Sequence, residues 1–290
     1  MKKNMIRALS ENGGVVFCGV DSTEMVREME RIHKTSAVTS AALGRLLTAA
    51  SMMGMMLKTE DASITLRLSG GGPAGTVLAV ANGDGCARGY VQNPVVELPM
   101  RADGKMDVGG AVGREGTLSV VRDMGMKEPY VGQVALQTGE IGDDLTYYFA
   151  TSEQIPSSVG LGVLMNKDNT VKAAGGFILQ LMPFAPEELI DKVEKRIGEL
   201  KSVTALIENG ETPEQLLSAV LGDIDFEVTD TLPVEFRCDC SKERILKSLA
   251  TLGKKDLDEL IHSGEGIEVK CQFCNTAYTF SPEDLKEIRS

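Results

Sequence analysis

The chain has 290 residues, a net charge of −12 and 42% hydrophobic residues, enough for one large core and one smaller module. An acidic surface repels a polyanion, so the overall charge argues against nucleic acid as the main partner. The N-terminus lacks the apolar region of a secretory signal, and the most apolar run, residues 41–57, contains an arginine and is short for a membrane span. The sequence therefore predicts a cytoplasmic protein with no membrane partner, a compartment in which cysteines favour metal or redox chemistry over structural disulfides.

Two helices are expected near the N-terminus. Residues 21–33 begin with helix-capping residue types, and their apolar residues recur at helical spacing: Met25, Val26, Met29 and Ile32. Residues 36–58 are rich in alanine and methionine and predict a second, deeply buried helix. The methionines at its end would suit a flexible binding face, but burial in the core is the simpler interpretation.

Strand patterns dominate the chain from residue 63 to residue 183. The alternating or apolar runs are 63–68, 76–91, 117–123, 130–140, 145–151 and 159–183. Asn82-Gly83-Asp84-Gly85 divides one of these runs and is a strong signal for a tight hairpin. Short strands joined by tight turns favour antiparallel sheets, so residues 1–183 are predicted to form an α+β domain.

A helical linker is expected over residues 184–230. Residues 186–201 are highly charged and carry an apolar helical stripe: Leu189, Ile190, Val193, Ile197 and Leu200. A second helix has Thr212 at its N-cap, Pro213 at N1, Gln215 at N3 and Gly222 as its stop. Such charged helices are marginal alone, so the stripe must be covered in the folded protein.

Four of the six cysteines lie near the C-terminus as a Cys-x-Cys and a Cys-x-x-Cys pair, with thirty residues between the pairs: Cys238, Cys240, Cys271 and Cys274. Structural zinc prefers four soft ligands in a tetrahedron, and two close pairs let two chain segments supply two thiolates each. A module of this size, residues 231–290, has a thin core that a metal would stabilise. The pairs therefore predict one zinc ion per chain, although the one-residue spacing is unusual for a zinc ribbon.

The rest of the small C-terminal zinc-binding module follows from local signals. Its expected elements are short helices over 241–252 and 254–262, a hairpin over 267–280 with its turn at the Cys-x-x-Cys, and a helix that starts at residues 281–284. His262 is expected at a helix end, because four cysteines already complete the tetrahedron. Cys18 and Cys86 belong to no motif and are expected to be small buried residues.

No catalytic residues are predicted, and the chain is not expected to be an enzyme. The glycine-rich segments 69–77 and 113–117 lack the Lys-Ser/Thr ending of a phosphate loop, and His33 has no evident triad partner. A thioredoxin-like enzyme would place its Cys-x-x-Cys near a βαβ unit, whereas this pair lies in a hairpin at the far end of the chain.

The zinc site has the properties of a switch. Zinc holds its sulfurs as thiolates, which are the form that oxidants attack. Structural zinc contributes on the order of 10–16 kcal/mol to a small domain. Closing loops of three or four residues with disulfides contributes only roughly 1.6–1.9 kcal/mol each. Oxidation that replaces the metal by local disulfides should therefore unfold the module.

The run FRCDCSKER followed by CQFCNTAYTF closely resembles the C-terminal zinc switch of the thirty-three-kilodalton chaperonin family, the redox-regulated heat-shock chaperones of bacteria. Other segments look like the N-terminal domain of that family: GREGTLSVVRD, YVGQVAL, GEIGDDLTYYFATSEQIPSSV and AAGGFILQLMP. The resemblance thus covers nearly the whole chain.

The resemblance implies zinc at Cys238, Cys240, Cys271 and Cys274 in an inactive reduced form. It implies an oxidised, zinc-free form with local disulfides and an unfolded linker, dimerisation, and ATP-independent binding of unfolding client proteins. Proximity favours Cys238 with Cys240 and Cys271 with Cys274, although the first bridge is strained, and a cross pair such as Cys240 with Cys271 stays open. No motif marks the residues that bind clients.

Two other functions stay open at this level. One is a constitutive structural zinc-ribbon protein, which could contact nucleic acid, and the other is a thiol oxidoreductase. Residues 231–290 contain nine Lys and Arg against eleven Asp and Glu, so a basic surface for nucleic acid is not indicated. Turnover of a disulfide substrate that is lost in Cys271→Ser would support the oxidoreductase.

Overall fold

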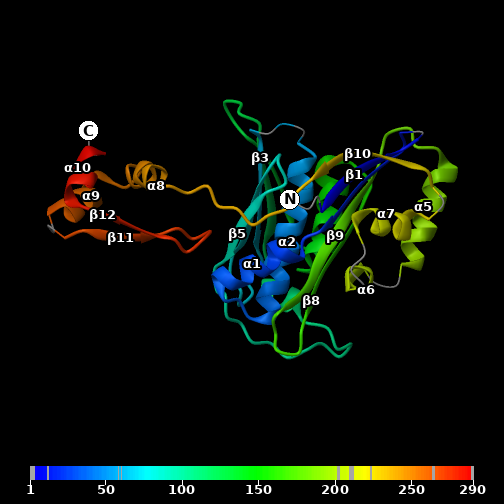
Figure 1. Cartoon of the computed structure of the whole chain (residues 1–290), viewed down its shortest axis with the longest axis horizontal. Helices are drawn as coiled ribbons and strands as arrows, with labels where there is room; N and C mark the ends of the chain where they lie inside the picture. Colours follow the sequence, from blue (N-terminus) through cyan, green and yellow to red (C-terminus); the bar gives the residue numbers. More distant parts are fainter. Residues whose placement is uncertain are drawn as a thin grey trace. The chain divides into compact units, whose positions relative to one another are not determined.

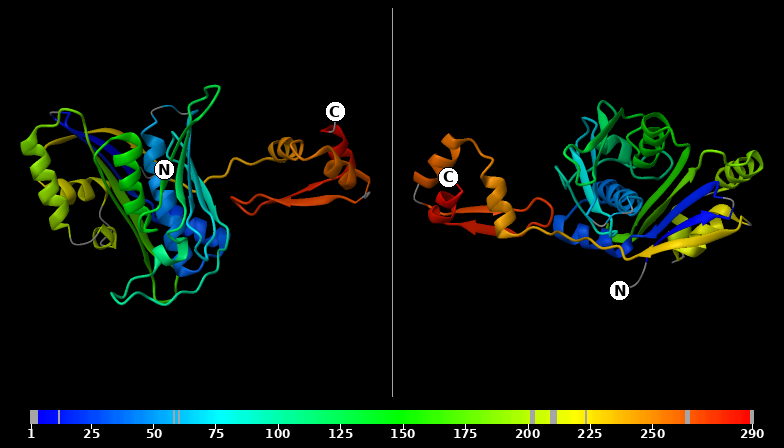
Figure 2. Two further views of the ribbon diagram at one scale, coloured as in Figure 1. Left: turned by 180° about the vertical axis from the view of Figure 1, so that it is seen from behind. Right: turned by 90° about the horizontal axis from the view of Figure 1, so that it is seen from above.

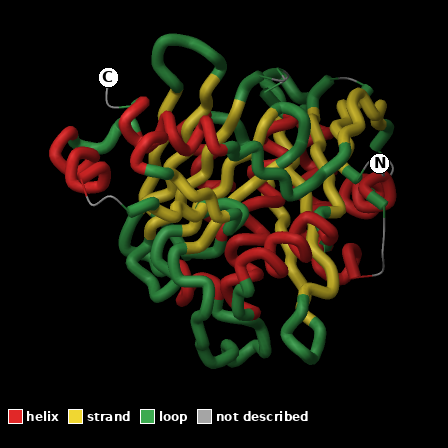
Figure 3. Tube along the Cα trace, turned by 60° about the vertical axis from the view of Figure 1, so that its left-hand side comes forward, coloured by secondary structure: helices red, strands yellow, loops and turns green. Residues whose placement is uncertain are grey.

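The computed structural model describes residues 4–11, 13–57, 59, 61–200, 203–208, 212–222, 224–262 and 265–288. The chain divides into two compact units, Met1–Phe236 and Arg237–Ser290, which are described separately here (Figure 1). The first unit contains two five-stranded sheets, and the second contains a two-stranded sheet (Figure 3). This is the predicted combination of antiparallel sheets with helices.

The first sheet gathers strands from both ends of the first unit. Its order is β10 (Phe226–Leu232), β1 (Met5–Ser10), β2 (Val15–Asp21), β9 (Val171–Leu181) and β8 (Ser157–Met165). All neighbouring strands are antiparallel. The strands predicted in the long run 159–183 are confirmed as β8 and β9, whereas no strand was predicted for the segments that form β1 and β2.

The second sheet is a set of hairpins. Its order is β5 (Ala87–Val91), β4 (Val77–Asn82), β3 (Ser63–Ser69), β6 (Thr117–Asp123) and β7 (Tyr130–Ala135). The predicted tight turn joins β4 to β5, and within it Gly85 has a φ of +83°, which glycine adopts without a steric penalty. The hairpin signal is therefore confirmed.

Helix α2 (Ala37–Met55) lies between the two sheets, next to α1 (Thr23–His33) (Figure 2). It contacts strands of both sheets, and its methionines Met52, Met53 and Met55 are buried in the main core. The interpretation of this segment as a core helix is confirmed. Lys58 and Lys201, the expected last residues of two helices, lie outside the described residues. Over the part of the chain that the structure describes, no helix has both the length and the apolar character that spanning a membrane requires.

The prediction of a strand over residues 145–151 is wrong. Residues 145–151 belong to helix α4 (Ile141–Tyr148) and to the π-helical turn η1 (Phe149–Glu153) that follows it. Their aromatic and β-branched side chains suggested a strand. The helix forms because Ile141, Leu145 and Tyr148 recur at helical spacing and are fully buried, and because acidic residues in the first turn suit the positive end of the helix dipole.

The linker helices cover the face of the first sheet that points away from α2 (Figure 1). They are α5 (Glu187–Glu199), α6 (Val203–Glu208) and α7 (Pro213–Leu221). Helix α6 contacts β8 and β9, α7 contacts β1 and β2, and α5 packs against α7. One apolar cluster joins the helices to the sheet: Ile6, Ala8, Val15, Phe17, Phe177, Leu179, Leu189, Val193, Leu216, Leu217, Val220 and Leu221. The apolar stripe of residues 186–201 is therefore covered within the first unit, in the apolar cluster that the linker helices share with the sheet.

The start of α7 has the capping box that its sequence predicts. The Gln215 N–H donates to the Thr212 hydroxyl at 3.3 Å, and the Thr212 N–H donates to the Gln215 side-chain oxygen at 2.7 Å. Pro213 follows the cap and Gly222 ends the helix. These contacts satisfy two backbone donors that a helix leaves free at its N-terminus.

After α7 the chain returns to the first sheet as the edge strand β10. Residues 231–236, which were expected in the C-terminal module, lie in the first unit. Leu232 pairs with Met5, Val234 is buried, and the Glu235 carbonyl accepts a hydrogen bond from the Ala87 N–H at 3.0 Å. The compact first unit extends to Phe236 because backbone pairing continues to this point. The division into functional parts, 1–183, 184–230 and 231–290, stays a prediction.

The second unit contains every element that its sequence predicts. These elements are α8 (Lys242–Leu249), α9 (Lys254–His262), β11 (Ile267–Lys270), β12 (Ala277–Phe280) and α10 (Pro282–Glu287). Its buried apolar core is small: Leu257, Ile261, Phe280 and Leu285. So small a core offers little stability by burial alone.

Truncation of a linker side chain tests how strongly α5–α7 are held on the sheet. Leu216 is 3% exposed in the cluster beneath α7, so Leu216→Ala is expected to reduce the free energy of opening the linker helices by about 2–4 kcal/mol. Hydrogen exchange of the amides in α5–α7 measures this free energy. Glu214→Ala, an exposed change in the same helix, is the control and should alter it by less than about 0.5 kcal/mol. Equal exchange in both variants would contradict the packing.

Candidate metal centre

The first cysteine pair lies just before α8. Residues two apart in an extended chain point to the same side, so the Cys-x-Cys spacing lets Cys238 and Cys240 face one point. The Arg244 guanidinium holds the residue between them, because it donates to the Asp239 carbonyl at 3.0 Å and forms an ion pair with its carboxylate. Ser241 caps α8 by accepting the Arg244 N–H at 3.2 Å. The start of α8 therefore fixes the orientation of the first pair.

The second cysteine pair forms the turn between β11 and β12. The Cys271 N–H donates to the Thr276 carbonyl at 3.0 Å, and the Asn275 N–H donates to the Cys271 carbonyl at 2.8 Å. Asn275 has a φ of +59°, a left-handed conformation that asparagine tolerates better than most residues. This tight turn brings Cys271 and Cys274 to the same side of the hairpin.

The four sulfur atoms meet, although thirty residues separate the pairs. All four Sγ atoms lie within 4.8 Å of one another. The Cys238 and Cys271 sulfurs are 3.7 Å apart, and the Cys240 and Cys274 sulfurs are 3.4 Å apart. A tetrahedral ion with metal–sulfur distances of about 2.3 Å would place its sulfurs about 3.8 Å apart. The four cysteines are free thiols in a spacing that could hold one metal ion.

The local environment shifts the pKa values of three of these thiols in different directions. Burial is the largest influence on Cys238 and Cys240, and it raises the pKa of both thiols above the ordinary value. Burial also raises the pKa of Cys274, but hydrogen bonds from the Thr276 hydroxyl and backbone, together with its cysteine neighbours, lower it to about 7. Cys274 is therefore the most easily ionised of these three thiols when no metal is bound, and a cation would have to displace protons from the other two.

Two hydroxyl groups contact the cysteine cluster, and neither residue was predicted to be part of the site. The Tyr278 hydroxyl lies 3.2 Å from the Cys240 sulfur, and the Thr276 hydroxyl lies 3.2 Å from the Cys274 sulfur. The contact with Cys240 is the main reason that the pKa of Tyr278 is raised to about 12. Thr276 lies two residues after Cys274 and was within reach of its sulfur, whereas the contact of Tyr278 with Cys240 joins residues far apart in the sequence and has no local signal.

The other cysteines and the histidines do not belong to this group of four sulfurs. Cys18 and Cys86 are buried as expected, and burial raises the pKa of Cys18 to about 12, which makes its thiol unreactive. The His262 ring nitrogen Nδ1 lies 2.7 Å from the Asp258 carbonyl one turn earlier, as expected for a helix-end residue. The His33 ring makes an edge contact with Phe236.

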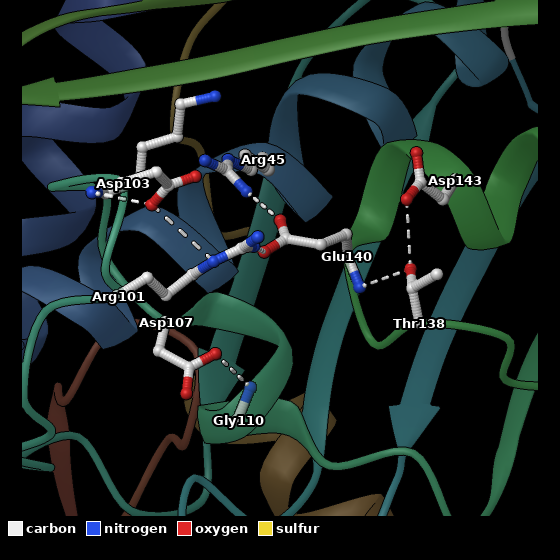
Figure 4. Close-up of polar contacts among 9 residues, drawn as sticks. Arg45, Arg101, Asp103, Asp107, Gly110, Thr138, Glu140 and Asp143 are labelled. Carbon is white, nitrogen blue, oxygen red and sulfur yellow. Dashed lines mark hydrogen bonds and ion pairs between the residues drawn. The ribbon is translucent and has the colours of Figure 1, made fainter.

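A group of charged residues in the first unit makes hydrogen bonds and ion pairs that connect a loop to neighbouring helices (Figure 4). Glu140 accepts hydrogen bonds from Arg45 of α2 at 2.6 Å and from Arg101 at 3.4 Å. Asp107 caps α3 (Val108–Val112) by accepting the Gly110 N–H at 2.9 Å. These bonds tie the loop before α3 to the central helix and to the start of α4.

Replacement of single cysteines tests whether the four sulfurs act as one site. Cys238→Ser, Cys240→Ser, Cys271→Ser and Cys274→Ser should each weaken binding of one metal ion by more than about 100-fold, since residues that merely orient ligands already cost about 10–100-fold. Competition with a chromogenic chelator measures the affinity. Cys18→Ala and Cys86→Ala are the matched controls and should bind as the unchanged chain does. Unaltered affinity in all four Ser variants would rule the site out.

The raised pKa values of Cys238 and Cys240 predict the pH dependence of metal binding. Both groups carry protons at neutral pH in the metal-free fold, and metal ligation needs thiolates. Binding must therefore release protons, so affinity should rise with pH, by about 100-fold per unit between about pH 6 and 8 if two protons leave. Calorimetry in buffers of different ionisation enthalpy counts these protons. An affinity that does not change over this range would contradict the prediction.

Known proteins resemble this chain over its whole length. The family model described as Hsp33 protein matches residues 3–281. The 33 kDa chaperonin of Agathobacter rectalis is 54% identical, and covers 100% of both chains, while that of Lachnoclostridium phytofermentans is 52% identical, over 99% of this chain and 98% of the relative. The crystal structure of the 33 kDa chaperonin from Thermotoga maritima, a heat shock protein 33 homologue, has a TM-score of 0.88 and 38% identity, over 99% of this chain and 98% of that one. These matches confirm the family that the sequence motifs indicated: the chain belongs to the Hsp33 family, which supports a chaperone role.

Proposed function

We propose that the protein is a redox-regulated holdase that binds unfolding proteins without ATP and prevents their aggregation. The observation that carries this proposal is the meeting of four free thiols in a unit with a small apolar core. Membership of a chaperone family supports the role and implies that the partners are unfolded client proteins. The reduced, zinc-bound form is the inactive one.

Cys238, Cys240, Cys271 and Cys274 are the proposed zinc ligands. The all-sulfur donor set and its near-tetrahedral spacing suit zinc better than hard cations, which prefer oxygen. A bound zinc ion would contribute folding free energy on the order of 10–16 kcal/mol. It would join the segment before α8 to the β11–β12 turn, in a unit whose buried apolar core is small.

Oxidation removes this link. Two thiolates form one disulfide and give up two electrons, which a two-electron oxidant such as a peroxide takes up as it is reduced to water. Each disulfide between close neighbours in the sequence restores only roughly 1.6–1.9 kcal/mol. Because the contribution of the metal is larger by several-fold, the second unit should lose its fold when the thiols are oxidised.

The path from this unit to the linker runs along the chain through β10. In the chain, the linker helices follow β9 and precede β10, and these two strands belong to the same sheet. β10 is an edge strand that pairs with β1 alone, and most of its residues are exposed. Such strands are among the less stable parts of a fold. Release of β10 would free the C-terminal end of the linker, whose short helices are marginal without the sheet.

The surface that this release uncovers suits an unfolding protein. Side chains such as Leu189, Val193 and Leu216 are buried in the folded protein, in the apolar cluster that also contains Phe17 and Phe177. Once exposed, they would form an apolar surface of the kind that binds other apolar segments. No nucleotide is required in this proposal, and the glycine-rich segment 69–77 connects β3 to β4 rather than starting a helix.

The proposal also covers the setting in which the protein acts. The oxidised form is proposed to be a homodimer in the cytoplasm, with neither nucleic acid nor a membrane as its partner. The net charge of −12 supports the exclusion of nucleic acid. The relatives are named as chaperonins, which fits a protein that is not an enzyme.

The disulfide pairing after oxidation is a separate prediction. Local pairs, Cys238 with Cys240 and Cys271 with Cys274, are expected because the partners of each pair are close in the sequence. In the folded state the two close sulfur contacts instead join the two segments, at 3.7 Å and 3.4 Å. Peptide mapping without reduction distinguishes the outcomes. Cross-pairs as the main product would close longer loops and leave the unit more constrained, which contradicts the proposed unfolding.

Light scattering of a heat-denaturing client protein, with zinc release followed in parallel by a chromogenic chelator, tests the proposed function. The oxidised protein should suppress scattering without ATP, and the reduced, zinc-loaded protein should not. The control is Cys18→Ala/Cys86→Ala, which retains only the four clustered thiols and should behave as the unchanged chain does.

The same assay separates the alternatives. Equal suppression by the reduced and oxidised forms would mean that the zinc is merely structural. Turnover of a small disulfide substrate that disappears in Cys271→Ser would favour a thiol oxidoreductase. A mobility shift of RNA that weakens with salt would favour a nucleic-acid partner.

A further inference from the structure

Tyr278 connects the apolar core of the second unit to the cysteine cluster. It lies on β12 opposite Val269 of β11, and its ring packs against the core formed around Leu257 and Phe280. Its hydroxyl reaches the other way, to 3.2 Å from both the sulfur and the backbone carbonyl oxygen of Cys240. One side chain thus touches the core of the unit and two atoms of a cysteine from the distant pair.

The charge of the sulfur determines what these contacts do. A thiolate carries no proton, so it can only accept a hydrogen bond, and the Tyr278 hydroxyl is then the donor. Hydrogen bonds to charged acceptors are stronger than those between neutral groups. The hydroxyl would share its proton between the Cys240 sulfur and carbonyl, which fixes both the charge and the orientation of that residue.

The Thr276 hydroxyl contacts a sulfur of the other pair. It accepts the Cys274 S–H at 3.2 Å, so in the thiolate form this hydroxyl must turn its own proton toward the sulfur, and the Thr276 carbonyl accepts the Cys271 N–H at 3.0 Å. The sulfurs of Cys240 and Cys274 are only 3.4 Å apart. The two hydroxyl groups therefore contact one sulfur from each pair, at the place where the two segments meet.

We infer that Tyr278 and Thr276 are positioning residues that hold the Cys240 and Cys274 thiolates for the metal and thereby set how readily an oxidant opens the site. This inference rests on the proposed zinc centre and extends it. Hydrogen bonds withdraw electron density from sulfur, so each hydroxyl makes its thiolate a weaker nucleophile toward an oxidant. Loss of either hydroxyl should loosen the metal and speed the oxidation of the thiols.

The test uses the full reduced chain with Tyr278→Phe, which keeps the ring in the core and removes only the hydroxyl. The affinity for zinc, measured by chelator competition, should fall by about 10-fold or more. Cobalt(II) in place of zinc reports on the sulfurs directly, and the sulfur-to-cobalt charge-transfer band should shift. The rate of thiol loss in hydrogen peroxide should rise by a similar factor. Thr276→Val, at an exposed position, should change the same three quantities in the same direction.

Thr279→Val is the matched control, because Thr279 is an exposed neighbour on the same strand that points to the opposite side. It should leave affinity, spectrum and rate unchanged. If Tyr278→Phe fails to fold, Thr276→Val alone decides the matter. Wild-type affinity, band position and oxidation rate in the folded variants would overturn this inference while the zinc centre stands. An unchanged chain that binds neither zinc nor cobalt would overturn both.

Discussion

The fold of residues 237–290 depends on the meeting of four sulfur atoms. Two segments that are thirty residues apart bring their thiols within 4.8 Å of one another, while the apolar core beside them has only four buried side chains. A core of that size does not supply the several kcal/mol that a stable unit needs. In the proposed function, a metal ion held by these sulfurs supplies most of the missing stability, so binding or loss of the metal would decide whether the unit is folded.

The linker carries an apolar surface that is buried in the folded protein and is held there by elements that have little stability of their own. Its three helices are short, and they keep their position because their apolar side chains share one buried cluster with residues of the first sheet. They lie between a central strand of that sheet and the exposed edge strand β10, which leads directly to Cys238. In the proposed function, a change at the cysteines would reach the linker along the backbone through β10.

Local chemistry explains which parts of this arrangement can be predicted from sequence. The turn at Asn82–Gly85, the capping box at Thr212 and the hairpin at Cys271 depend on neighbouring residues, and all three are present. The aromatic run 145–151 was misread because intrinsic strand preference is weaker than helical burial of Ile141 and Leu145. β10 depends on a partner more than two hundred residues earlier, which no local signal shows. The contact of Tyr278 with Cys240 likewise depends on long-range geometry.

If the proposed switch operates, the fold around the cysteines and the cover of the linker are lost together. Hydrogen exchange followed by mass spectrometry, on the reduced zinc-loaded protein and on the oxidised protein, measures both losses. Oxidation is expected to make the amides of α5–α7, β10 and the second unit exchange fast, while α2 and β9 stay protected. Continued protection of α5–α7 in an oxidised protein whose second unit exchanges fast would contradict it, because the two parts would then be uncoupled.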